Sequence, residues 1–279
     1  MKYIYHTSKL IIACLIISVF SFDAFAGGWP VKKGKFVIAP SLIYYHATKF
    51  WDRSGQLTPY TNGGYFNSTG VYVYGEYGLA KRVTLTASLP YVVNSYKQGT
   101  VQNSLAGLTD AELGARFYLT NIDFKYYFAV QGTAVVPLYK NTPTTYYGYQ
   151  SGGGEIRLIG SGTGTVFGKD FYFDAEAGGR QYFANSGPFQ LRYTGSLGLA
   201  IVKHHQISLG ISGVKSMSTN KISSTNLVYN RDYYFNQASF TYIYSVNNHL
   251  SFTAGINEFI NGRNTGKGTS YFFSTILKF

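Results

Sequence analysis

The amino-acid sequence predicts an all-β membrane protein, a closed antiparallel transmembrane β-barrel of about 12 strands. Three observations support this prediction: two stretches in which apolar and charged residues alternate, connections that are by turns short and long, and a last strand that ends on an aromatic residue. Successive residues of a strand point to opposite faces. Strict alternation therefore places one set of side chains in lipid and the other in an enclosed lumen.

The two alternating stretches lie at 108–119 and 172–183 and share the spacing Asp-x-Glu-x-Gly-x-Arg. Apolar residues such as Leu113 and Phe117 occupy the opposite parity. Carboxylates and guanidinium groups on neighbouring strands can neutralise one another inside a narrow lumen, while the apolar parity suits hydrocarbon. In chain order, the charged positions are Asp110, Glu112, Arg116, Asp174, Glu176 and Arg180.

The start of the chain is typical of a secretory signal peptide. A basic beginning precedes an apolar run at 10–22 and the cleavage site Ala24-Phe25-Ala26. A lipoprotein signal ending at Cys14 is the alternative, but it would leave a very short hydrophobic region. We therefore expect residues 1–26 to be removed and residues 27–279 to form a barrel in the outer membrane. The exported chain then has no cysteine for a disulfide or a thiolate nucleophile.

Each expected strand carries apolar residues on one parity and small or polar residues on the other. Pro40 lies within the first strand, so we expect a bulge or an unpaired position there. Gly160, Gly162 and Gly164 leave open the parity of the sixth strand, which could be reversed or bulged. The expected strands are 35–47, 67–79, 82–94, 108–119, 124–138, 154–167, 172–183, 189–202, 206–215, 233–246, 250–257 and 268–279.

The connections between these strands alternate in length. This asymmetry is typical of outer-membrane barrels, which have short periplasmic turns and longer external loops, and it places both termini on the periplasmic side. The segment 27–34 is too short for a folded plug. The short turns are 80–81, 120–123, 168–170, 203–205 and 247–249, and the external loops are 48–66, 95–106, 139–153, 185–188, 216–232 and 258–267.

The last strand ends on Phe279, with Tyr271, Phe273 and Leu277 on the same parity. This ending resembles the carboxy-terminal signal by which the barrel-assembly machinery recognises outer-membrane proteins. We therefore expect that machinery as a partner, together with outer-membrane lipid and lipopolysaccharide.

The composition agrees with a porin-like protein of the Gram-negative envelope. Aromatic residues make up 18% of the chain and charged residues 13%, and tyrosine suits the membrane–water interface. After residue 26, no segment reaches the roughly 18 consecutive apolar residues of a transmembrane helix. The formal net charge is +12, but nucleic acid is not an expected partner of an exported protein.

Two segments carry a family resemblance. YGLAKRVTLTASLPYV at 77–92 and GLTDAELGARFYL at 107–119 resemble motifs of the outer-membrane transporter-like family named after the meta-pathway of phenol degradation. The resemblance is best over 72–137 and weaker after Gly187. It implies an outer-membrane barrel that passes aromatic or other small hydrophobic compounds, and it carries no catalytic residues. The chain is also loosely similar to twelve-stranded channels for nucleosides or acidic sugars.

The ionisable residues assigned to the lumen permit two interpretations. They form either a charged constriction that selects solutes or a salt-bridge network that braces the barrel. Arg192 is the best candidate for a solute-facing cation because it has no carboxylate on its own strand, and Arg157 comes next. The inward set is Glu76, Asp110, Glu112, Glu155, Asp174 and Glu176 against Arg116, Lys125, Arg157, Arg180, Arg192 and Lys278.

The external loops are aromatic and basic. The aromatic candidates form either a path for solutes at the mouth or a belt at the membrane interface. The basic side chains attract either anionic solutes or lipopolysaccharide phosphates. The aromatic candidates are Trp51, Tyr60, Tyr146, Tyr147 and Tyr149.

Catalysis is not expected. An outer-membrane hydrolase, the remote alternative, needs a serine beside a histidine, and only His46 is predicted near the outer rim. His204 and His205 share a turn with no third ligand nearby, so we expect neither a metal nor a cofactor site. The stronger rival to a channel is a non-conducting structural or adhesive barrel. Thr84 is expected to face the lumen and to tolerate lysine.

Overall fold

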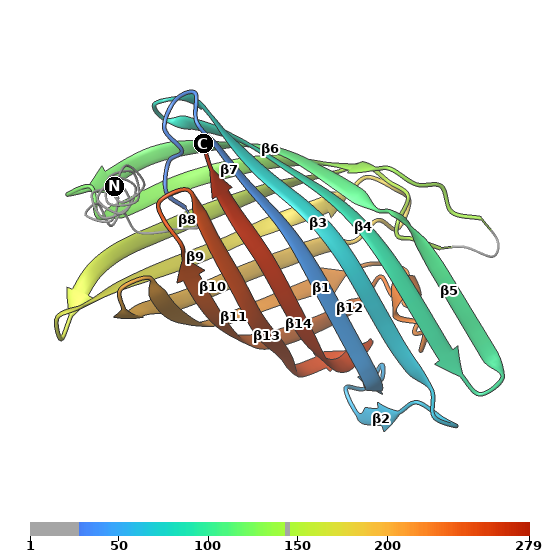
Figure 1. Ribbon diagram of the computed structural model, residues 1–279. Coiled ribbons are helices and arrows are strands. Elements are labelled where there is room, and N and C mark those ends of the chain that lie inside the picture. Colours follow the sequence, from blue (N-terminus) through green and yellow to red (C-terminus); the bar gives the residue numbers. More distant parts are fainter. Residues whose placement is uncertain (1–27, 143–145) are drawn as a thin grey trace, which may run out of the picture.

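The computed structural model describes residues 28–142 and 146–279, which form one closed antiparallel β-barrel (Figure 1). The expected signal peptide at 1–26 lies outside the described residues, so its removal stays a prediction. Each barrel strand pairs with the next barrel strand along the chain, and β14 pairs with β1 to close the cylinder. Within these residues the barrel has the predicted twelve strands: β1 (Phe36–Trp51), β3 (Tyr65–Ala80), β4 (Val83–Gln98), β6 (Asp110–Ile122), β7 (Tyr126–Pro137), β8 (Gly153–Val166), β9 (Lys169–Tyr182), β10 (Phe189–Val202), β11 (His205–Met217), β12 (Tyr233–Ser245), β13 (Leu250–Arg263) and β14 (Thr265–Lys278).

Three short elements lie at the end of the barrel away from the two chain termini, which the sequence predicts to be the external end. The strand β2 (Leu57–Pro59) pairs with the end of β1, and β5 (Val101–Leu108) pairs with the end of β4. A 3-10 turn, η2 (Leu227–Tyr229), lies in the connection between β11 and β12. No helix in the described part of the chain is long and apolar enough to cross a membrane.

The distribution of side chains inverts that of a soluble protein. Leu113 is 56% exposed and Leu209 is 62% exposed on the outer surface, whereas Arg116 and Glu155 are buried inside. Water would make so large an exposed apolar surface unfavourable, but hydrocarbon is a suitable solvent for it. The predicted parity, apolar outward and polar inward, is confirmed.

Two expected external loops are largely strand, so their prediction is wrong. The expected loop 95–106 is a hairpin whose strands, β4 and β5, are joined by Gly99 and Thr100. The expected loop 258–267 consists mostly of β13 and β14, joined at Asn264. Strand ends beyond the bilayer meet water on the outside, so they do not need the apolar parity on which the prediction rested. Gly99 and Asn264 both have positive φ angles, of 59° and 51°, which allow these tight reversals.

The turn between β6 and β7 lies later than predicted. Asp123, Phe124 and Lys125 form it, and the Lys125 N–H donates to the Ile122 carbonyl at 3.0 Å. Phe124 is 81% exposed with a positive φ of 54°. In the sequence, the alternation of apolar and polar residues begins at Phe124, so the predicted strand began there, inside the observed turn. The assignment of Lys125 to the lumen is therefore wrong.

Two open questions of register are resolved. Pro40 lies opposite Val73 of β3, but on the β14 side the pairing skips Ala39 and Pro40. This is the predicted unpaired position rather than a bulge. Strand β8 pairs with β7 and β9 without a register shift. Its glycines therefore do not reverse the parity: Glu155 is buried inside, while Ile156 is 67% exposed outside.

We predict that Leu113→Lys lowers the free energy of unfolding by about 2 to 4 kcal/mol, because it places a charge on the lipid face. Urea unfolding in lipid vesicles measures this change. Thr84 is not the tolerant control expected from the sequence, because its side chain is 0% exposed. Ser88→Lys is the better control, since Ser88 lines a lumen cavity and pairs in register with Glu112. Equal destabilisation by both lysines would show that the parity is wrong.

Candidate functional site in the lumen

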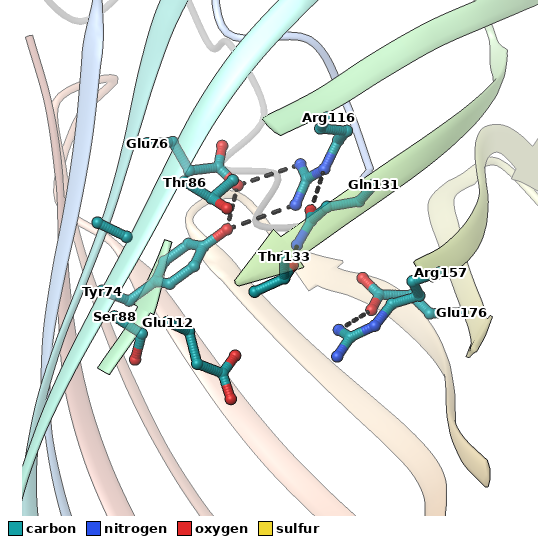
Figure 2. A pocket seen from close by; sticks show the side chains of 11 residues that line it. Tyr74, Glu76, Thr86, Ser88, Glu112, Arg116, Gln131, Thr133, Arg157 and Glu176 are labelled. Carbon is teal, nitrogen blue, oxygen red and sulfur yellow. Dashed lines mark hydrogen bonds and ion pairs between the residues drawn. The ribbon is translucent and has the colours of Figure 1, made fainter. Parts of the chain in front are cut away.

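The lumen contains a polar cavity of about 320 Å³ between the walls formed by β3, β4, β6, β7, β8 and β9 (Figure 2). Three carboxylates and two guanidinium groups line it, together with hydroxyl and amide groups. Alternation along the strands brings the polar and charged side chains inward, whereas Ala87 belongs to the outward parity. The lining residues are Tyr74, Glu76, Thr86, Ala87, Ser88, Glu112, Arg116, Gln131, Thr133, Arg157 and Glu176.

Arg116 is fixed in the wall of this cavity. Its Nη1 lies 3.1 Å from Glu76 Oε1 on β3, and its Nε donates to Gln131 Oε1 on β7 at 3.0 Å. The side chains of Arg116 and Glu76 are only 5% and 9% exposed. The ion-pair partner of Arg116 is therefore a carboxylate from β3, rather than Glu112 on its own strand.

Arg180 is the most buried arginine of this network. Its Nε donates to Glu155 Oε2 on β8 at 2.6 Å, and its Nη2 donates to Glu112 Oε1 on β6 at 2.5 Å. Arg180 and Glu155 have side chains that are 3% and 1% exposed, but Glu112 is 32% exposed. Arg180 and Glu155 therefore brace the wall, whereas Glu112 also reaches the open lumen.

Arg157 connects this network to a second cavity. Its Nε donates to Glu155 Oε1 at 2.8 Å, and its Nη1 donates to Glu176 Oε2 at 2.6 Å. Arg157 and Glu176 line both cavities, so the two spaces adjoin at this ion pair. The Arg157 side chain is 23% exposed, so it forms part of the accessible surface of the lumen.

The second cavity has a volume of about 300 Å³. Arg192 lines it, and no ion pair of Arg192 is found in the described residues. Arg192 is thus the candidate cation that sequence reasoning placed in contact with solutes. The other lining residues are Arg157, Glu176, Tyr193, Thr194, Ser212, Gly213, Val214, Phe235 and Gln237.

Asp110 and Asp174 line neither of these two cavities. Asp110 Oδ2 accepts a hydrogen bond from the Tyr182 hydroxyl at 3.3 Å. Asp174 Oδ2 accepts one from the Gly28 N–H at 2.9 Å and one from the Ser161 hydroxyl. Asp174 therefore holds the polypeptide that precedes β1.

The segment before β1 lies against inward-facing side chains at the end of the barrel where β1 begins. The Trp29 carbonyl accepts a hydrogen bond from the Tyr118 hydroxyl at 2.6 Å, and the Trp29 ring makes an edge contact with Tyr172. Backbone atoms of Lys32 approach Gly78 so closely that a Cβ there would lie 2.1 Å from the Lys32 oxygen. The segment has no helix or strand, as its length predicts, yet it narrows the lumen.

The connection between β11 and β12 folds against aromatic side chains at the external mouth. The Tyr60 hydroxyl donates to the Thr225 carbonyl at 3.0 Å, and the Tyr96 hydroxyl shares a hydrogen bond with the Thr225 hydroxyl. Leu227 and Val228 pack on the cluster that contains Tyr60 and Tyr96. We call residues 218–232 the mouth loop.

The five aromatic candidates have mutual or local partners at this end. Tyr146 stacks on Tyr229 of the mouth loop with ring centroids 4.8 Å apart. Tyr149 makes an edge contact with Tyr182, and Tyr147 packs on Tyr139. Trp51 and Tyr60 are buried. Tyr60, Tyr146 and Tyr149 all contact the mouth loop, since the Arg231 guanidinium lies 5.7 Å from the centre of the Tyr149 ring, whereas Trp51 and Tyr147 lie along the wall.

Asp232 anchors the mouth loop, a role that the sequence did not reveal. Its two carboxylate oxygens accept hydrogen bonds from Lys221 and Arg263, each at 2.8 Å, and its side chain is 6% exposed. Burial raises the pKa of Asp232, but hydrogen bonds from Lys221 and Ser218 and the charge of Arg263 outweigh it, so the pKa lies below its usual value. One feature of the sequence could have indicated this anchoring role: Asp232 is one of the few acidic residues in loops that are otherwise basic.

The described residues contain no group of three metal-ligating side chains of the His, Cys, Asp and Glu types. His46 faces outward and shares a hydrogen bond with Asn67, and His205 shares one with Tyr242. In the described part of the chain, neither histidine has a serine hydroxyl as a recorded hydrogen-bond partner.

Comparison with solved structures places this fold among outer-membrane barrels. The chain is similar to the COG4313 outer membrane channel from Pseudomonas putida F1, with a TM-score of 0.68 and 12% identity over 93% of this chain and 100% of the other. It also resembles the β domain of the Bordetella autotransporter BrkA (TM-score 0.53, 8% identity, 88% and 100% covered). The NanC porin gives a TM-score of 0.51 with 8% identity, covering 85% and 98%.

No family model matches the sequence, and no curated protein matches it. At such low identity, the structural similarities establish a porin-like barrel fold and leave the activity to be argued from the lumen, because one fold supports different functions.

We predict that Arg180→Gln lowers the free energy of unfolding by about 3 kcal/mol, because it removes a partner from the buried Glu155 carboxylate. Arg192→Gln is the matched control and should cost roughly 1 kcal/mol or less, since no ion pair is broken. Urea midpoints in vesicles measure both changes. A similar loss for both variants would contradict the division into bracing and accessible arginines.

We predict that the mouth loop loosens at low pH. Because the pKa of Asp232 is depressed in the folded state, its stabilisation is complete above the unfolded pKa of about 3.9 and is lost as the pH falls through the lower folded value. Amide hydrogen exchange of residues 218–232, corrected for intrinsic rates, should rise below about pH 4. Asp232→Asn should show the faster exchange already at neutral pH. Unchanged exchange in this variant would exclude the anchoring role.

Proposed function

We propose that this protein is an outer-membrane channel for small solutes. The observation that carries the proposal is the pair of adjoining, charge-lined cavities inside a closed barrel whose exterior is apolar. The exterior fixes the location in a membrane, and strand-built barrels of this kind belong to the outer membrane. Export by the predicted signal peptide and insertion through the terminal Phe279 complete the proposed route.

The accessible charges support conduction rather than bracing alone. Glu155 and Arg180 are almost completely buried and can only brace the wall. Glu112 and Arg157 keep exposed fractions of 32% and 23%, and Arg192 has no ion pair among the described residues. A charged side chain that only braces the wall does not require exposure to the lumen. A charged side chain that selects solutes must be exposed to the lumen in order to contact them.

The lumen is narrowed at both ends. The segment before β1 lies at one end, and the mouth loop lies at the other. We therefore expect small conductance steps and passage of small molecules, not a wide diffusion pore. External lipopolysaccharide is the proposed neighbour of the basic loops.

The finer assignment is to aromatic or other small hydrophobic compounds, as the sequence resemblance implies. Aromatic side chains around the mouth loop, including Tyr96 and Tyr229, support a preference for flat solutes at the entrance. The lumen beyond is polar, so a solute that crosses it should also carry a polar group.

A non-conducting structural or adhesive barrel is the second candidate. It is favoured by the dense ion pairs around Arg180 and by the narrowing of the lumen at both ends. Passage of ions distinguishes the two functions. A hydrolase remains the remote alternative, without a supporting residue arrangement at His46.

We predict that refolded residues 27–279 produce discrete conductance steps in planar lipid bilayers in potassium chloride. Arg192→Ala should shift the reversal potential toward cation preference, because it removes a cation from the lumen. Lys140→Ala, a change of the same charge in an external loop, is the control. Folded protein that inserts without any conductance would contradict the channel and favour the structural barrel.

A further inference from the structure

The two lumen cavities carry opposite excess charge. The first is lined by three carboxylates, of Glu76, Glu112 and Glu176, against the two guanidinium groups of Arg116 and Arg157. The second is lined by Arg157 and Arg192 against the single carboxylate of Glu176. The first cavity therefore has one negative charge in excess and the second has one positive charge in excess.

The excess negative charge lies on an accessible side chain. Glu76 is only 9% exposed and is held by Arg116, and Glu176 is 13% exposed and is held by Arg157. Glu112 is 32% exposed and meets Arg180 through Oε1. Its Oε2 has no recorded protein partner in the described chain. Figure 2 shows the Glu112 side chain reaching into the cavity.

The excess positive charge is accessible for a different reason. Arg192 has no ion pair within the described ranges, although it lines the same cavity as Glu176. Hydroxyl and amide groups of Thr194, Ser212 and Gln237 complete the polar lining around it. A carboxylate at this site would find a planar guanidinium donor, which binds such groups in two hydrogen bonds.

Between these two poles the lumen is locally neutral, because Arg157 and Glu176 are paired where the cavities adjoin. A solute with a single negative charge gains attraction at Arg192 but is repelled at Glu112. A solute with a single positive charge meets the reverse arrangement. Only a molecule with both charges gains at both poles, and enclosure in a low-dielectric wall strengthens both interactions.

We propose that the lumen selects small zwitterionic solutes, with the cationic group at Glu112 and the anionic group at Arg192. This inference rests on the proposed channel function, since it names the class of solute that the same lumen accepts. An aromatic or aliphatic body between the two charged groups is compatible with the assignment.

Equilibrium binding to the folded barrel tests this inference without requiring conduction. The probes are straight-chain ω-amino carboxylates from γ-aminobutyrate to ω-aminooctanoate, titrated calorimetrically into the refolded protein in detergent. For the tightest probe, one analogue replaces the ammonium by methyl, a second replaces the carboxylate by carboxamide, and a third carries both changes. The zwitterion should bind on the order of tenfold more tightly than each singly charged analogue, because each loses one charge-assisted contact.

Two variants assign the poles. Glu112→Gln should abolish the advantage of the zwitterion over the analogue without ammonium, and Arg192→Gln should abolish its advantage over the carboxamide analogue. Arg180 keeps Glu155 as a partner in the first variant, so the wall remains braced, and heat-modifiable electrophoretic mobility checks folding. Lys140→Gln should change neither preference.

Equal affinity of the tightest-binding zwitterion and its three analogues would overturn the inference. The absence of saturable zwitterion binding to the folded barrel would also overturn it. Conductance in potassium chloride is measured separately on the same preparation. Conductance without zwitterion preference would contradict the inference and leave the channel standing. Zwitterion preference in a barrel that does not conduct would support the site and contradict the channel.

Discussion

Pairing of β1 with β14 is the constraint on which the rest of the structure depends. In hydrocarbon no water can satisfy an unpaired N–H or C=O group, so the sheet must close on itself. The seam runs from Val37 opposite Lys278 to Trp51 opposite Thr265. Figure 1 shows these first and last strands, blue and red, side by side. Even near the gap at Pro40, whose nitrogen cannot donate, the Ser274 hydroxyl donates to the Pro40 carbonyl at 3.1 Å.

Closure also determines the chemistry of the interior. Because every second side chain must face lipid, the polar set is forced into a narrow, enclosed space where isolated charges are costly. The network around Arg180 and Glu155 meets that cost by pairing the charges of β6, β8 and β9. Glu112 and Arg192 are the positions where the charge is least neutralised by protein groups. We propose that a charged solute binds at these two side chains. A soluble β-protein would have no comparable reason to gather these charges inside.

The strand positions and their parity were predictable because alternation is a local property of the chain. The partners of the charged residues were not. Arg116 shares its strand with Asp110 and Glu112 but pairs with Glu76 of β3, because the stagger between strands is set by closure of the whole barrel. The extension of β13 to Arg263 and the anchoring of Asp232 also escaped prediction. Strand residues outside the membrane have water on both faces, so alternation of apolar and polar residues does not identify them. Contacts such as those of Asp232 join residues that are distant in the sequence, so a local pattern does not reveal them.

The most direct test of the central claim is a scan of β6 from Ala111 to Leu119 by single cysteines in residues 27–279, which contain no cysteine of their own. Each cysteine would carry an environment-sensitive fluorophore in vesicles that contain brominated lipid. Quenching should alternate with a period of two residues, strong at Leu113 and Phe117 and weak at Glu112 and Arg116. Uniform quenching along the strand, or quenching with the opposite parity, would contradict a closed barrel with a polar interior.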